Sequence, residues 1–146
     1  RAALVGLAAA ATGGVAAAPV EVLATLPREA LVAGSERVVR GPFALQALVT
    51  LGDGDVLQLA ASGTTAVAGE YAGAGGSRFV RLLASYPSAA AAAAALASVR
   101  DRLDPYLTAV ERAERRLVFR DHAGRFGAVT VDGARLEVLA NLAAAP

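Results

Sequence analysis

The chain has 146 residues, enough for one domain of ordinary size with a hydrophobic core of its own. Its 14 basic and 13 acidic side chains nearly balance, so the charge indicates no attraction to nucleic acid or to an anionic membrane. The sequence contains no cysteine, which excludes a disulfide framework, thiol catalysis and thiolate metal sites.

The first 17 residues predict the remnant of a secretory signal peptide. A basic Arg1 precedes an apolar stretch of about ten residues, and small residues follow before Pro19. The alternative is a buried alanine-rich helix, which Gly13 and Gly14 would interrupt. We therefore expect cleavage after Ala17, export to the periplasm or the extracellular space, no membrane span after signal removal, and one domain over residues 18–146.

The first part of that domain predicts two short helices. Residues 26–34 carry Pro27, which suits the first turn of a helix. Residues 43–51 space Leu45 and Leu48 as a helix does. A glycine-rich turn ends this region.

Two strands and a long helix are predicted next. Residues 64–71 and 78–86 alternate as strands around a glycine-rich connection, and the second is apolar on both sides, as a central strand is. Residues 88–103 predict a helix, because Ser88 can cap it and seven alanines follow. Its apolar stripe, which we expect to pack on the sheet, consists of Ala92, Leu96, Val99 and Leu103.

The last third is predicted to return to strands. Residues 106–116 fit a helix or a polar edge strand equally well. Strands are expected over residues 117–120, 125–131 and 134–142, the last with Leu136, Val138, Ala140 and Leu142 on one face. This order predicts an α+β fold: an antiparallel sheet of four to five strands with one main alanine-rich helix packed on it.

Few side chains indicate chemistry. His122 is the single histidine and stands in a polar turn beside Asp121. A triad with Ser35 can be drawn, but the surrounding sequence is not a nucleophile elbow. Asp53 and Asp55 are too few for a calcium site, which needs about six to eight oxygens. We therefore expect no catalytic residues, no metal and no cofactor.

Four short motifs resemble those of an uncharacterised family of exported bacterial proteins, domain of unknown function number six five nine nine. They are Gly34-Ser35-Glu36-Arg37, Gly41-Pro42, Gly69-Glu70-Tyr71 and Tyr86-Pro87-Ser88. The similarity runs from about residue 26 to the end of the alanine-rich helix. It implies an exported α+β protein, with this domain either alone or as one half of a longer two-repeat chain, and no established activity.

These observations favour a non-catalytic binding or assembly module of the cell envelope. Its partner would be another protein or a second copy, docking on an exposed small-residue surface at Ala66 and Ala68. The loop Ser35-Glu36-Arg37 is the candidate ligand contact. The alternative is a secreted enzyme of unrecognised type, which would require that loop and His122 to converge in one cleft.

Overall fold

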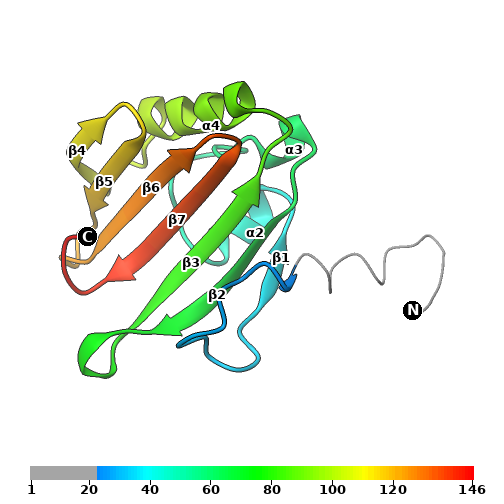
Figure 1. The fold of residues 1–146 in the computed structure, drawn as a ribbon. Coiled ribbons are helices and arrows are strands. Elements are labelled where there is room, and N and C mark those ends of the chain that lie inside the picture. Colours follow the sequence, from blue (N-terminus) through cyan, green and yellow to red (C-terminus); the bar gives the residue numbers. More distant parts are fainter. Residues whose placement is uncertain (1–22) are drawn as a thin grey trace, which may run out of the picture.

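The computed structural model describes residues 23–146, and the expected signal segment of residues 1–17 lies outside them. One antiparallel sheet dominates the described fold, with strand order β1-β2-β3-β7-β6-β5-β4 (Figure 1). The strands are β1 (Arg37–Val39), β2 (Ala66–Ala72), β3 (Arg78–Ser85), β4 (Thr108–Ala113), β5 (Arg116–Arg120), β6 (Phe126–Asp132) and β7 (Arg135–Leu142). The combination of one antiparallel sheet with a few helices agrees with the α+β prediction.

The sheet has seven strands, so the expected number of four to five was wrong. The first missing strand, β1, has only three residues, too few for a visible alternation. The second, β4, falls in the segment that fitted helix or strand equally well. A register shift between Ala109 and Glu111 interrupts the alternation of inward and outward side chains in β4. Such a β-bulge removes the period-two pattern by which a strand is predicted from sequence.

The predicted hairpin of β2 and β3 is present, and a 3₁₀ turn, η1 (Ala74–Gly76), connects its strands. Its register places Val67 opposite Leu83 and Tyr71 opposite Phe79. β3 also pairs with β7, so it is an interior strand, as its two apolar faces predicted. The last strand of the chain thus returns to the middle of the sheet.

The alanine-rich helix α4 (Ala89–Asp101) begins where the sequence predicts, because the Ser88 hydroxyl accepts a hydrogen bond of 3.0 Å from the Ala91 N–H. α4 packs on β5, β6 and β7. Three residues of the expected stripe, Ala92, Leu96 and Val99, are buried there. None of the helices in residues 23–146 is both long enough and apolar enough to cross a membrane.

The segment between β1 and β2 covers the same face of the sheet as α4 (Figure 1). It contains two short helices, α2 (Pro42–Gln46) and α3 (Leu59–Ser62), so the helix expected over residues 43–51 is shorter than predicted. Leu51, Val56 and Leu57 from this segment are fully buried against the sheet. Ala66 and Ala68 belong to the same core and have no exposed surface, which overturns the docking surface expected there.

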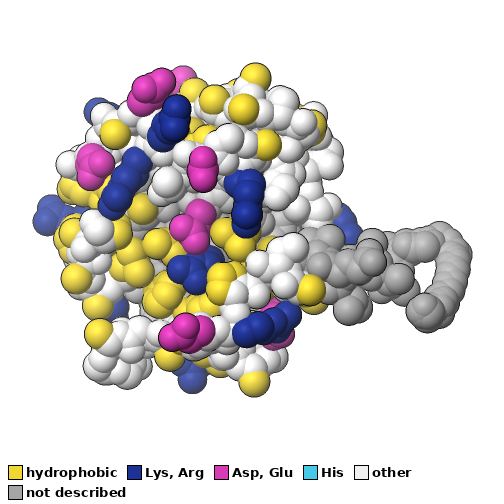
Figure 2. Space-filling model, in the orientation of Figure 1, with side chains coloured by type: hydrophobic (Ala, Val, Ile, Leu, Met, Phe, Trp, Pro, Cys, Tyr) yellow, Lys and Arg dark blue, Asp and Glu magenta, His cyan; other side chains and the backbone are white. Residues whose placement is uncertain are grey.

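The N-terminal part of the described chain lies against the other face. The helix expected over residues 26–34 is absent, since Ala30 has a φ of 66° and Leu31 forms a β-bridge with Tyr71. The buried Leu26 and the half-buried Leu31 lie over Gly69, and a turn replaces the helix. Basic and acidic side chains are interspersed with apolar ones on this face of the molecule (Figure 2). Arg81 of β3 and Glu137 of β7 form an ion pair of 2.9 Å.

Candidate functional site

Ser35, the first residue of the expected ligand loop, is buried and has its hydrogen bonds made within the fold. Its hydroxyl donates to the Val32 carbonyl at 2.7 Å and accepts from the Glu70 N–H at 3.0 Å. These bonds fasten the N-terminal segment to the edge of β2. The hydroxyl is therefore a structural clamp in this fold.

Glu36 pairs with Arg28 at 3.1 Å, and not with its neighbour Arg37. The hydrogen bond from the backbone N–H of Glu36 itself, followed by the Arg28 guanidinium, lowers the pKa of the Glu36 carboxyl. Arg37 begins β1 and is exposed. Among the described residues, Arg37 has no ion pair, and it stands at the sheet edge beside a carboxylate that is already paired.

His122 does not join this loop. It stands in the turn between β5 and β6, whereas Arg37 belongs to β1 at the opposite side of the strand order. The structure therefore does not assemble the polar centre of Ser35, Glu36, Arg37 and His122 that the enzyme alternative required.

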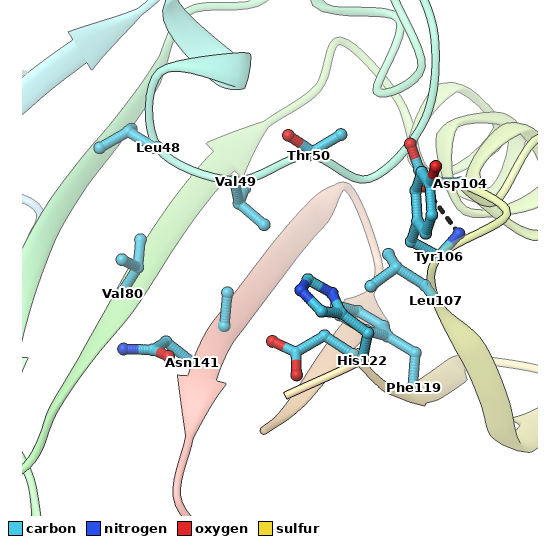
Figure 3. Close-up of a pocket in the computed structure, with 12 residues that line it drawn as sticks. Leu48, Val49, Thr50, Val80, Asp104, Tyr106, Leu107, Phe119, His122 and Asn141 are labelled. Atoms are coloured by element: carbon cyan, nitrogen blue, oxygen red, sulfur yellow. Dashed lines mark hydrogen bonds between the residues drawn. The ribbon is translucent and has the colours of Figure 1, made fainter. Parts of the chain in front are cut away.

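His122 instead lines a cleft of about 590 Å³ on the core side of the sheet (Figure 3). Three separate parts of the chain form it: the loop after α2, the loop between α4 and β4, and one end of the sheet. Its lining residues are Leu48, Val49, Thr50, Val80, Asp104, Tyr106, Leu107, Phe119, Asp121, His122, Ala140 and Asn141. We call it the His122 cleft.

The floor of the His122 cleft is apolar and belongs to the sheet. Val80 of β3 and Ala140 of β7 are directly paired across the ladder. Phe119 of β5 pairs with Gly127 of β6, and the Phe119 ring occupies the space that a side chain at residue 127 would need. Glycine at that position therefore lets the ring lie close to the sheet and complete the floor.

Asp121 shapes the polar side of the cleft. One of its carboxylate oxygens, Oδ1, accepts hydrogen bonds of 2.9 Å from the N–H groups of both Ala123 and Arg125. Gly124 closes the turn with a φ of 83°, a conformation that glycine adopts without strain. The turn holds His122 at its tip, where the imidazole is exposed.

Asp104 plays the same part in the facing loop. Its Oδ1 accepts from the Tyr106 N–H at 2.9 Å, drawn as a dashed line in Figure 3. The backbone N–H of Asp104 donates to the Leu51 carbonyl at 2.8 Å, which ties this loop to the loop after α2. Tyr106 is left 76% exposed, and its ring meets the His122 ring edge to face at a centroid distance of 6.3 Å.

A bulge in β7 opens the remaining side. Phe126 pairs with Leu142 but Ala128 pairs with Leu139, so two residues of β7 oppose one residue of β6. Asn141 sits in this bulge with a φ of 64°. The extra residue turns Leu142 away from the face of Val138 and Ala140, which corrects the expectation that all of these share one face.

The His122 cleft has the composition of a binding site. In the described part of the chain, no hydrogen bond orients the His122 imidazole, whereas a catalytic base needs such a partner. The same residues contain no group of three or more possible metal ligands. An apolar floor with a few polar groups at its rim is the usual composition of a ligand pocket.

The sequence placed His122 and Asp121 together in one polar turn, but it gave no reason to add Asp104 to them. In the structure, Asp104 and Asp121 each accept backbone N–H groups of their own turn. The signal available was that both acids precede aromatic or histidine side chains in such turns. Their closeness depends on the bond between Asp104 and Leu51, which no local pattern contains.

Comparisons of the chain with models of protein families, with curated proteins and with solved structures found no match. The resemblance to the family of unknown function therefore stays a prediction that rests on the four sequence motifs.

Proposed function

We propose that this protein is an exported, non-catalytic binding module that holds a small, largely apolar ligand in the His122 cleft. The observation that carries the proposal is the cleft itself, of about 590 Å³, with a floor formed by Val80, Phe119 and Ala140. This volume lies in the range of about 300–1,000 Å³ typical of small-molecule sites. Export is part of the proposal and rests on the signal-like sequence.

A binding role is favoured over catalysis by where the polar groups lie. The expected loop at Ser35 belongs to another part of the sheet, and its hydroxyl and carboxylate have partners within the fold. The hydroxyl groups that line the cleft are those of Thr50 and Tyr106. Neither has a hydrogen-bonded base among the described residues, so neither has the activation that a nucleophile requires.

The test uses N-phenyl-1-naphthylamine, an uncharged dye whose emission rises in an apolar site. We expect saturable binding to the 146-residue chain, with amide NMR shifts at Val49, Phe119 and Ala140. Val80 is half-buried on the cleft floor, so Val80→Phe should fill part of the cleft and weaken dye binding about tenfold or more.

The matched control is Ala97→Phe, which adds the same ring at an exposed position of α4, outside the cleft. It should leave the dye affinity unchanged. Equal affinity of the Val80→Phe variant and the unsubstituted chain, with both folded by circular dichroism, would overturn the proposal.

A further inference from the structure

We infer that the ligand of the His122 cleft is cationic: an apolar body carrying a protonated amine. The inference rests on the proposed binding function and adds the charge of the ligand. Two carboxylates, Asp104 and Asp121, line the cleft, and none of the arginines in residues 23–146 lines it. Arg120 lines a neighbouring hollow that shares Tyr106, Asp121 and His122, but not the cleft itself.

Both carboxylates are fixed before any ligand arrives. Each uses its Oδ1 atom to accept backbone N–H groups of its own turn. In the described structure, the Oδ2 atom of each carries no hydrogen bond or ion pair. Two held acceptors with a free oxygen each suit a donor that brings positive charge and several N–H groups, as an ammonium group does.

The aromatic side chains of the cleft fit the same ligand. The ring of Tyr106 is largely exposed beside Asp104, so one face remains available to a cation. Phe119 offers an apolar surface on the floor for the body of the molecule. An anionic ligand would meet two carboxylates without a compensating arginine, and a purely apolar one would leave both carboxylates unused.

Three probes with the same naphthalene body separate these cases: 1-naphthylmethylamine, 1-naphthylmethanol and 1-naphthoate. At pH 7 they are cationic, neutral and anionic. We expect the amine to bind roughly tenfold more tightly than the alcohol, because two partly exposed ion pairs together contribute about that factor. The carboxylate should bind more weakly than the alcohol.

The variants Asp104→Asn and Asp121→Asn remove each charge and keep the Oδ1 atom that holds the turn. Each should reduce the preference for the amine over the alcohol about two- to fivefold, and the double variant should abolish it. Asp132→Asn, at the last residue of β6 and so at the far end of that strand, is the matched control and should leave the preference for the amine unchanged.

Two results would overturn the inference. One is equal binding of the amine and the alcohol, and the other is a preference that survives in the double variant. If all three probes bind with equal affinity, and Val80→Phe weakens their binding equally, the binding function stands and only the charge of the ligand is wrong. If Val80→Phe also leaves the affinity for N-phenyl-1-naphthylamine unchanged, the proposed binding function itself is wrong.

Discussion

The segment around Ser35 and the His122 cleft are both polar regions at the margins of one sheet, and they use their polar groups differently. At Ser35 the hydroxyl and the neighbouring Glu36 carboxylate bind atoms of the fold. In the cleft, Asp104 and Asp121 each have one oxygen without a partner among the described residues, beside an apolar floor. The difference shows that polar residues alone do not identify a site. The cleft differs because its carboxylates have oxygens that the hydrogen bonds of their own turns do not use.

The largest expected effect comes from substitution of Gly127. This change should alter both the stability of the fold and ligand binding in the cleft. A Cβ at this position would clash with the Phe119 ring and lie 2.8 Å from the Leu139 carbonyl oxygen, which belongs to the backbone and cannot move aside. Gly127→Ala should lower the free energy of unfolding by about 3 kcal/mol, measured by urea denaturation. The displaced ring should also weaken dye binding to the cleft.

Gly133→Ala provides a comparison at a glycine outside the cleft. A Cβ at this position would meet no atom within 4 Å, so the loss of stability would come only from placing alanine at a φ of 59°. It should lower stability by about 1 kcal/mol and leave dye binding intact. If Gly127→Ala lost stability while the dye still bound at full affinity, Phe119 would not be part of the binding floor.

Ser35→Ala is the next largest change and should affect only stability. It removes the hydroxyl that bonds Val32 and Glu70, and it leaves the Glu70 N–H without its partner. We expect a loss of about 2 kcal/mol in the free energy of unfolding, with unchanged dye affinity. Arg37→Ala, at the exposed start of β1, should change stability by less than about 0.5 kcal/mol. A fall in dye affinity in either variant would indicate that the loop Ser35-Glu36-Arg37 takes part in ligand binding.

Much of the fold was predictable where the pattern is local. The cap at Ser88, the alanine run of α4 and the alternation of β2 and β3 each lie within a few residues, and the structure places these elements as expected. The predictions that were wrong depended on distant contacts. Residues 26–34 form no helix because Leu31 bridges to Tyr71 across forty residues of sequence.

The cleft could not be predicted for the same reason. Its walls come from loops near residues 50 and 104, joined by one backbone hydrogen bond, and from a bulge that the alternation of β7 conceals. The sequence predicted the polar turn at Asp121 and His122, but not the turn at Asp104. The sequence could not show that these two turns lie close together, because their closeness depends on the position of β7 beside β3 in the sheet.

Among the buried side chains, the smallest expected effect at neutral pH concerns Tyr86. Its hydroxyl donates to the Leu57 carbonyl at 2.6 Å and so holds the segment that carries Leu48 and Val49. Burial, and after it the Asp55 carboxylate, raises the pKa of the Tyr86 hydroxyl well above its ordinary value. The unfolded chain therefore loses this proton near pH 10, before the folded protein does, so the stabilisation is complete below about pH 10 and is lost as the pH rises further.

Tyr86→Phe should cost about 1 kcal/mol at pH 7 and flatten the decline of stability between about pH 10 and 12, measured as Tm against pH. Tyr106→Phe, at a largely exposed tyrosine on the opposite side of the cleft, should keep the full decline. Because the raised pKa keeps the Tyr86 hydroxyl protonated in the folded protein, the dye affinity of the unsubstituted chain should hold over the same alkaline range until global unfolding. A decline as steep in Tyr86→Phe as in the unsubstituted chain would show that another group controls the alkaline transition.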